Sequence, residues 1–243
     1  MSEILRAEWF DINNKDKDKL CSWLHGVFFP DLQSQNGVSW VAHYDIVPHP
    51  ETRYIKGAPA RKEVKDLSVP PGQENLVLTS ANTPSIFFGP NNALEAMEKE
   101  HPVYLSMRTN YRSAVFIEEE MINGPELHKQ PIGTGGAPAM QFGSYNVDGI
   151  RDDIELAKWY RGERFPRLPV TRGMIRGRKF LSISGWAKHG VLWEFAEMDE
   201  EEYSFEHRFM EADRGENWHG RHVLEYVTHA PGSPHAGRRI WPK

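Results

Sequence analysis

The chain contains one stretch twice. Residues 16–37 and 152–173 align without a gap at a constant offset of 136 positions. The identical pairs are Asp16/Asp152, Leu20/Leu156, Trp23/Trp159, Gly26/Gly162, Phe29/Phe165, Pro30/Pro166, Leu32/Leu168 and Gly37/Gly173. Average composition gives roughly one or two chance identities over such a length, so the match indicates an internal repeat. We therefore expect the same supersecondary unit to occur twice.

The repeated unit has the pattern of a helix, a proline stop, a glycine turn and a strand. Leu20 and Trp23 fall at helical spacing. Pro30 is expected to end the helix, because proline pushes the preceding residue out of the helical region. Gly37 is expected to turn the chain into an alternating, strand-like run. The second copy repeats this order through residues 152–183.

An alternating strand pattern also precedes each copy. Further strand and helix patterns follow, including a helix at 199–213 and a final strand at 222–230. The resulting order β, α, β, β, α, β is the ferredoxin-like arrangement, a four-stranded antiparallel sheet with both helices on one face. The other face is left apolar, and the matching sheet of the second repeat is its natural cover. We predict an α+β fold of two tandem ferredoxin-like repeats, packed sheet to sheet as an intrachain pseudo-dimer.

The boundary between the repeats is predicted near residue 135, in a segment rich in glycine and proline. The first unit then spans residues 1–135, with a proline-rich insertion near 48–75, and the second spans 136–243.

Composition excludes several functional classes. A chain of 243 residues with 39% hydrophobic content can bury a sizeable core. The net charge of −5, without a long basic stretch, argues against nucleic-acid binding. No long apolar run and no signal-peptide pattern occur, so we expect no membrane association and a cytoplasmic location. Cys21 is the single cysteine, which excludes an intrachain disulfide and a cysteine-based metal site.

The segments ELAKWYRGERFPRL, RGMIRGRKF and GVLWEF resemble the dimeric α+β barrel superfamily and, within it, the EthD-like proteins. The likeness covers roughly residues 140–229 and, more weakly, 5–47. It implies that a fold usually built as a homodimer of short chains is fused in tandem here, and it allows a homodimer of the whole chain. It also implies small aromatic or polyketide-like ligands, handled without a metal or an organic cofactor. The histidine that such proteins tend to carry two residues before the proline is replaced by Phe28 and Arg164.

The second repeat is the more polar copy, so we place the predicted pocket between its first helix and its sheet. The first copy has Leu24, Phe28, Trp40 and Ala42 where the second has Tyr160, Arg164, Arg176 and Arg178. Arginines at period two share one strand face and could clamp a carboxylate. The expected catalytic groups are Tyr160, Glu194 and His222; the expected substrate-binding groups are Arg164, Arg176, Arg178, Trp159 and Trp23.

Each of these residues also has a structural interpretation. The arginines could be solvated or paired with acidic residues, Glu194 could be one of those partners, and the aromatic residues could be packed at the helix–sheet seam. His25 and His43 in the first repeat are the alternative acid–base candidates. His219 and His222 have a spacing that metals use, but no carboxylate-rich frame accompanies them, so we predict no metal. The resemblance to the EthD-like proteins implies that no organic cofactor is used either.

The leading functional hypothesis is a cofactor-independent enzyme that acts by proton transfer on a small aromatic or hydrophobic carboxylic acid, as a lyase or an isomerase. A cofactor-free monooxygenase and a non-catalytic protein that binds a hydrophobic ligand are the alternatives, because fold does not fix function.

Overall fold

The computed structural model describes residues 3–47, 62–89, 92–130, 135–198 and 227–243. Half of the proline-rich insertion, the helix expected at 199–213 and both His219 and His222 lie outside these ranges.

The first repeat has the predicted order of strands and helices. Its elements are β1 (Ile4–Ile12), η1 (Asn14–Asp16), α1 (Lys17–Trp23), η2 (Leu24–Phe28), α2 (Phe29–Ser34), β2 (Val38–Ile46), β4 (Asn75–Ala81), α3 (Ser85–Phe88), α4 (Ala93–Glu100), α5 (Pro102–Leu105) and β5 (Arg108–Asn123). The strand order β2-β4-β1-β5 is antiparallel throughout, as a ferredoxin-like sheet requires.

The described part of the second repeat has the same order of strands, with a first helix between its first two strands. Its elements are β6 (Ala139–Val147), α6 (Ile150–Trp159), η5 (Tyr160–Arg164), η6 (Phe165–Val170), β7 (Met174–Ser184), β8 (His189–Phe195), β9 (Val227–His229) and β10 (His235–Trp241). A short helix, η4 (Leu127–Lys129), lies between β5 and β6. The strand order β7-β8-β6-β9 mirrors that of the first sheet. A two-residue strand, β3 (Lys62–Glu63), pairs with β9.

The structure bears out the internal repeat. Trp23 and Trp159 are both buried at the last position of the first helix of their repeats. A wide π-helical turn follows each of them, η2 and η5. Gly37 and Gly173, with φ of 93° and 76°, then turn the chain into β2 and β7 in the left-handed region that glycine tolerates best.

Several local predictions were wrong. Pro30 does not end its helix; it lies in the first turn of α2, where the preceding π turn has already interrupted the regular hydrogen-bond ladder. The residue patterns at 85–88 and 102–105 predict strand, but both segments are short helices. Within the described residues, the last strand of the chain is β10, which the sequence did not predict, whereas only Val227–His229 of the expected final strand is a described strand.

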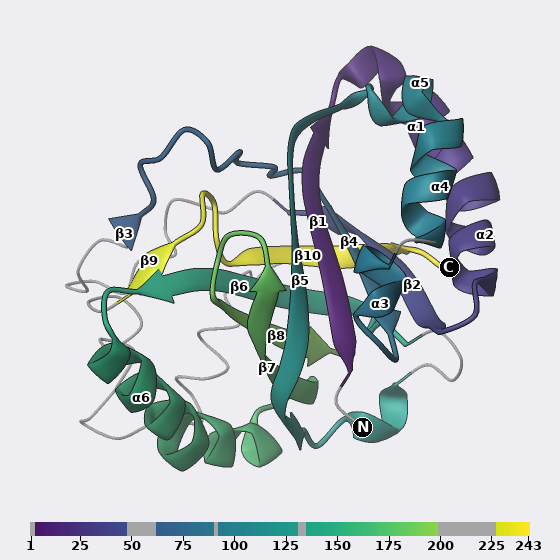
Figure 1. Cartoon of the computed structure of the whole chain (residues 1–243). Helices are drawn as coiled ribbons and strands as arrows, with labels where there is room; N and C mark the ends of the chain where they lie inside the picture. Colours follow the sequence, from purple (N-terminus) through teal and green to yellow (C-terminus); the bar gives the residue numbers. More distant parts are fainter. Residues whose placement is uncertain (1–2, 48–61, 90–91, 131–134, 199–226) are drawn as a thin grey trace.

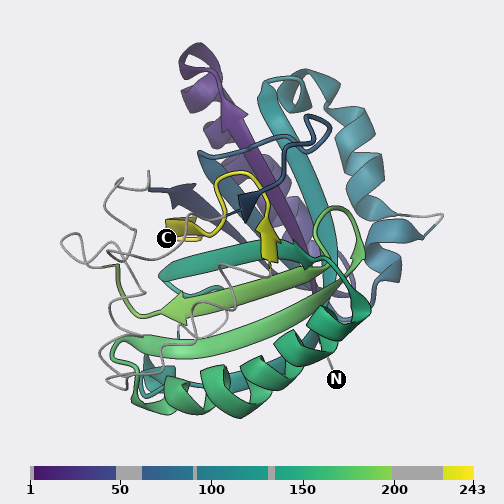
Figure 2. The same ribbon diagram turned by 90° about the vertical axis from the view of Figure 1, so that its left-hand side faces the viewer.

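The two sheets join into a closed barrel. Strand β5 pairs with β7 at one junction, and β10 pairs with both β2 and β6 at the other. Figure 1 shows the strands of the two repeats crossing steeply, with α1, α2 and α4 outside one sheet and α6 outside the other. The turned view in Figure 2 shows α6 lying along the outer side of its own sheet.

Three apolar clusters follow from this layering. One lies between the sheets and includes Trp9, Phe116, Phe142 and Phe180. The other two lie between each sheet and its own helices, around Trp23 and Trp159 respectively. Side chains that alternate along a strand therefore belong to different layers, which decides which of the predicted site residues can meet.

The inter-sheet cluster predicts that the repeats unfold together. Phe142 is fully buried and contacts Trp9 from the other repeat, with ring centroids 5.4 Å apart. Phe142→Ala should lower the free energy of unfolding by about 3–5 kcal/mol in a single urea transition. Phe88→Ala, at a half-exposed side chain, should change it by less than about 0.5 kcal/mol. Two separate transitions would contradict the shared core.

Candidate functional site

The predicted arginine pair points into the barrel and not towards the helix. Arg176 and Arg178 share a strand face with Phe180, which belongs to the inter-sheet cluster. Gly177 between them faces the other layer, because a Cβ there would meet Leu168 and Trp193. The equivalent positions in the first repeat, Trp40 and Ala42, also line the inter-sheet cluster.

Both arginines have internal acidic partners. Arg176 pairs with Glu194 and also donates to the Gly135 carbonyl at 2.9 Å. Arg178 is fully buried and pairs with Glu3 and with Glu118, the latter at 2.6 Å. These are the partners that the structural interpretation of the arginines requires.

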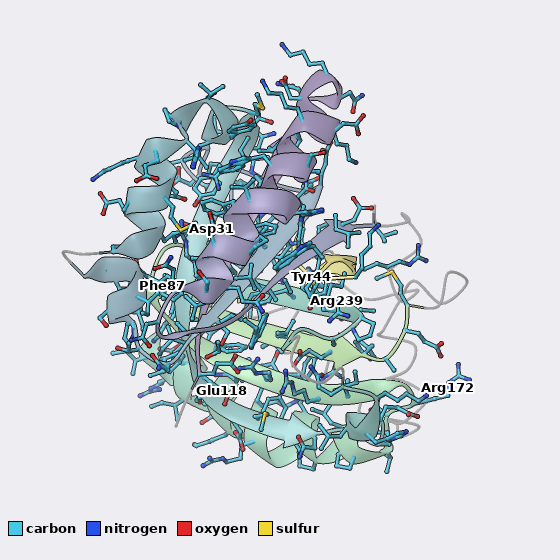
Figure 3. The ribbon with its side chains drawn as sticks, turned by 90° about the vertical axis from the view of Figure 1, so that its right-hand side faces the viewer. Asp31, Tyr44, Phe87, Glu118, Arg172 and Arg239 are labelled. Atoms are coloured by element: carbon cyan, nitrogen blue, oxygen red, sulfur yellow. The ribbon has the colours of Figure 1, made fainter. Side chains whose placement is uncertain are left out.

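Glu3 also links Arg178 to residues of the first repeat. It accepts hydrogen bonds from Trp40 Nε1 at 2.6 Å and from the Ser80 hydroxyl. Tyr44 donates to the Ala137 carbonyl at 3.1 Å, beside Arg239 (Figure 3). Glu3 and Glu118 carried no signal in the sequence, because only the closed barrel brings residue 3, residue 118 and residue 178 together.

Tyr160, Trp159 and Arg164 lie on the opposite layer, between the helix and the sheet of the second repeat. Tyr160 accepts a hydrogen bond from the Tyr145 hydroxyl at 2.7 Å, and burial raises its pKa to about 12. Arg164 Cζ lies 5.7 Å from the Trp193 ring centroid and 5.9 Å from that of Trp159. A phenol with a raised pKa loses its proton less readily, which disfavours the predicted role of Tyr160.

The prediction of one pocket built by all these groups is therefore wrong. Arg176, Arg178 and Glu194 lie inside the barrel, whereas Tyr160, Trp159 and Arg164 lie outside the sheet; His222 is not among the described residues. The physical reason is that the strand face shared by the arginines is the one turned towards the other repeat. Trp23, in turn, stacks on Tyr104 with ring centroids 4.5 Å apart, as a packed aromatic residue does.

The two histidines of the first repeat do come together. His25 in η2 and His43 in β2 approach to 2.8 Å between Nε2 and Nδ1, and His43 Nε2 lies 3.0 Å from the Asn75 amide oxygen. His25 is half-buried and His43 fully buried. The His25–His43–Asn75 chain thus runs from the protein surface to the sheet, and it starts on a π-helical turn, a feature often found at functional sites.

The hydrogen bonds assign the proton positions in this chain. Asn75 donates through its amide nitrogen to the Phe10 carbonyl at 3.4 Å, so its oxygen faces His43 and accepts from Nε2–H. His43 Nδ1 is then the acceptor for His25 Nε2–H. This leaves His25 Nδ1 with a free lone pair, and no described residue donates to it.

Both imidazoles are held in the neutral form. Burial lowers the pKa of His43 to about 3, with the neighbouring His25 acting in the same direction and the bond to Asn75 opposing them. Burial also lowers the pKa of His25, as does the positive charge of Lys243. A neutral, partly exposed imidazole with a fixed tautomer is suited to act as a base.

The second repeat uses the same two positions differently. His25 corresponds to Arg161 and His43 to Lys179 at the offset of 136. Arg161 is exposed and pairs with Glu120, and Lys179 pairs with Glu119. Neither His25 nor His43 is paired with a described carboxylate. The first repeat therefore holds the better candidate for acid–base chemistry.

Asn75 was not predicted as part of this site. It lies 32 residues from His43 in the sequence and reaches it only because β4 pairs with β2. Among the described residues no group of three or more histidine, cysteine, aspartate or glutamate side chains could hold a metal ion. No helix in the described part of the chain is both long and apolar enough to cross a membrane.

The buried His43 predicts a specific loss of stability in acid. Unfolded His43 binds a proton near pH 6.5, whereas the folded side chain resists protonation until about pH 3. Between these values the unfolded state holds more protons, so the free energy of unfolding should fall as the pH falls, by up to about 1.4 kcal/mol per pH unit. Urea unfolding from pH 7 to pH 4 measures this.

The variant His43→Gln should lose this part of the slope, whereas His128→Ala, at an exposed histidine, should keep it. An unchanged slope in His43→Gln would show that His43 is not buried in its neutral form.

Comparison with solved structures identifies the fold. No protein-family model matches the sequence, and no curated protein matches it. A protein provisionally assigned as a chlorite dismutase matches with a TM-score of 0.60 and 10% identity, over 99% of this chain and 95% of that one. A provisionally assigned monooxygenase from Fusobacterium nucleatum gives a TM-score of 0.57 and 9% identity, over 98% and 93%. An anthrone oxidase-like protein gives 0.53 and 10%, over 98% and 91%. The chain therefore has the dimeric α+β barrel fold, with both halves of the barrel supplied by one polypeptide.

Proposed function

We propose that this protein is an enzyme that transfers a proton on a small aromatic or otherwise hydrophobic acid, as a cofactor-independent lyase or isomerase. The observation that carries the proposal is the 2.8 Å contact between His25 and His43, which leaves His25 Nδ1 as an oriented base. The reaction type is the one predicted from the sequence, but we assign the site to the first repeat and not to the second.

His25 would act as the proton acceptor. Its Nδ1 would take a proton from the substrate, and the imidazolium so formed would keep donating through Nε2–H to His43. His43 cannot rotate freely, because Asn75 holds its other nitrogen, so it fixes the plane and tautomer of His25. Such positioned bases typically contribute about 10²–10⁴ in rate.

The surroundings suit an acidic, aromatic substrate. Phe29 and Trp241 lie next to His25, with ring centroids at 5.8 and 6.5 Å, and the Trp241 ring is stacked on the imidazole. Lys243 acts on His25 and Lys17 on His43 through their positive charges. Their charges would attract a carboxylate to this face of the protein.

A cofactor-free monooxygenase is the second candidate. Two solved structures of the same fold bear the descriptions monooxygenase and anthrone oxidase-like. The same base would be needed there, because removal of a proton produces the electron-rich anion that dioxygen oxidises. A protein that only binds the ligand would need no oriented base.

Turnover assays separate the three functions. A panel of small aromatic acids and phenols is incubated in deuterated buffer, with and without oxygen. NMR follows C–H exchange and product formation, and an electrode follows oxygen uptake. Loss of a group from the substrate, rearrangement of the substrate or exchange of its C–H protons, each without oxygen uptake, supports the lyase or isomerase. Stoichiometric oxygen uptake supports the monooxygenase, and saturable binding without any reaction supports the binding protein.

On a substrate found in this way, His25→Ala should lower kcat by about 10²–10⁴. The matched control His128→Ala removes an exposed histidine and should leave kcat unchanged. Because the pKa of His25 lies below its usual value of 6.5, activity should fall in acid only below that pH. Full activity of His25→Ala would refute the assignment.

Asn75→Asp tests the positioning role separately. A carboxylate facing His43 Nε2 would favour the charged form of the histidine pair, so the acid limb of the rate profile should move to higher pH. A purely structural role for Asn75 would change stability and leave the shape of this profile as it was.

A further inference from the structure

Arg112 is a buried cation without a hydrogen-bond acceptor. It lies in β5 on the face that continues through Ala114 and Phe116 into the inter-sheet cluster. The side chain is only 6% exposed, and none of its Nε, Nη1 and Nη2 atoms has a hydrogen-bond partner in the described structure. Burial lowers its pKa to about 9, so the guanidinium still carries its charge at neutral pH.

Arg176 and Arg178, which also point into the barrel, differ from Arg112 in having acidic partners. Arg176 is paired with Glu194, and Arg178 with Glu3 and Glu118. A buried charge without such a partner costs several kcal/mol. Arg112 has a single compensating contact among the described residues, a cation–π contact in which its Cζ lies 3.7 Å from the Trp9 ring centroid. That contact contributes about 2 kcal/mol when desolvated, which leaves part of the cost uncompensated.

Further unpaired donors belong to the same end of the barrel. Trp9 is the cross-strand partner of Arg112, and its indole Nε1 has no hydrogen-bond partner in the described ranges. The hydroxyl of Ser144 is also buried and unpaired among these residues. Ser144 follows Phe142 on one face of β6, and Phe142 contacts the Trp9 ring. Arg112, Trp9 and Ser144 therefore offer donors where an apolar interior would be expected to offer none.

The geometry favours a planar anion with an apolar body. Stacking on Trp9 fixes the plane of the guanidinium and leaves its N–H edge available for a carboxylate, which it can bind through two parallel hydrogen bonds. The rings of Trp9 and Phe142 supply apolar contact area next to that edge.

We propose that the end of the barrel formed by Trp9, Arg112 and Ser144 binds a small aromatic carboxylate. This site lies between the two sheets, whereas His25 and His43 lie on the helix-covered side of the first sheet, so it is distinct from the proposed catalytic site. The carboxylate of the ligand would supply the negative charge that no described residue provides for Arg112.

Benzoate is the probe, added to the full chain and followed by calorimetry and by the indole N–H signals in a ¹⁵N–¹H spectrum. Wild-type protein should bind benzoate saturably and shift the Trp9 signal, which Trp9→Phe identifies by its absence. Arg112→Met keeps the length of the side chain and removes its charge. It should weaken binding by about thirtyfold or more, the effect of losing one partner of a buried charge pair.

Two controls separate this site from its surroundings. Arg176→Met removes a paired arginine of the same interior, so it should lower Tm and keep the benzoate affinity. Arg112→Met should instead leave Tm unchanged or raise it, because no described partner loses its counter-charge. In His25→Ala, benzoate should still shift the Trp9 signal with wild-type affinity, which separates this site from any binding of an aromatic acid at His25.

The proposal is overturned if benzoate does not bind, if Arg112→Met binds it with wild-type affinity, or if His25→Ala abolishes binding. The affinities for sulfate and chloride are measured in the same way. Equal affinity for these ions would show a general anion site and refute the assignment to an aromatic carboxylate. If Arg112→Met does not fold, Arg112→Lys replaces it, since a point charge without the planar fork should still weaken benzoate binding.

Discussion

Closure of the barrel is the constraint on which the rest of this structure depends. Each ferredoxin-like sheet covers one face with its own helices and leaves the other face apolar, so neither sheet is stable alone. Pairing of β5 with β7 and of β10 with β2 and β6 joins the sheets edge to edge. The same pairing brings Trp9, Phe142 and Phe180 into one core. The edges of β5, β7, β2 and β6, which would favour aggregation if exposed, are covered in the same step.

Closure also divides the polar residues into two layers. Residues that face inwards have to be neutralised within the barrel, as Arg178 is by Glu3 and Glu118. Residues that face outwards meet the helices, where His25 reaches His43. The repeats have diverged within this frame. Paired positions hold neutral imidazoles in the first copy and cations with acidic partners in the second. Arg112 departs from the inward pattern, because the described chain provides it with an aromatic ring and no acid.

The repeat, the strand order and the ferredoxin-like units could be predicted from the sequence because they depend on local periodicity. Trp23 and Trp159, with the glycines that follow, fixed the register of one copy on the other. Helix ends were less predictable. After the π-helical turns η2 and η5, a proline no longer has to end the helix, because the turn has already interrupted the regular hydrogen bonds. The periodicity of apolar residues does not reveal such a widened turn. Strand β10 was missed because its pattern is weak and its pairing joins both repeats.

The sequence by itself determined which residues could do chemistry: His25, His43 and the arginines were all recognisable as ionisable groups at strand or helix positions. It also determined that Arg176 and Arg178 share a face, since strands alternate with period two. Only the tertiary structure decided which layer that face meets and which acids neutralise it, because Glu3, Glu118 and Glu194 come from distant strands. Likewise, His25 and His43 are 18 residues apart and Asn75 a further 32. The contact of η2 with β2 and the pairing of β2 with β4 make them one hydrogen-bonded chain.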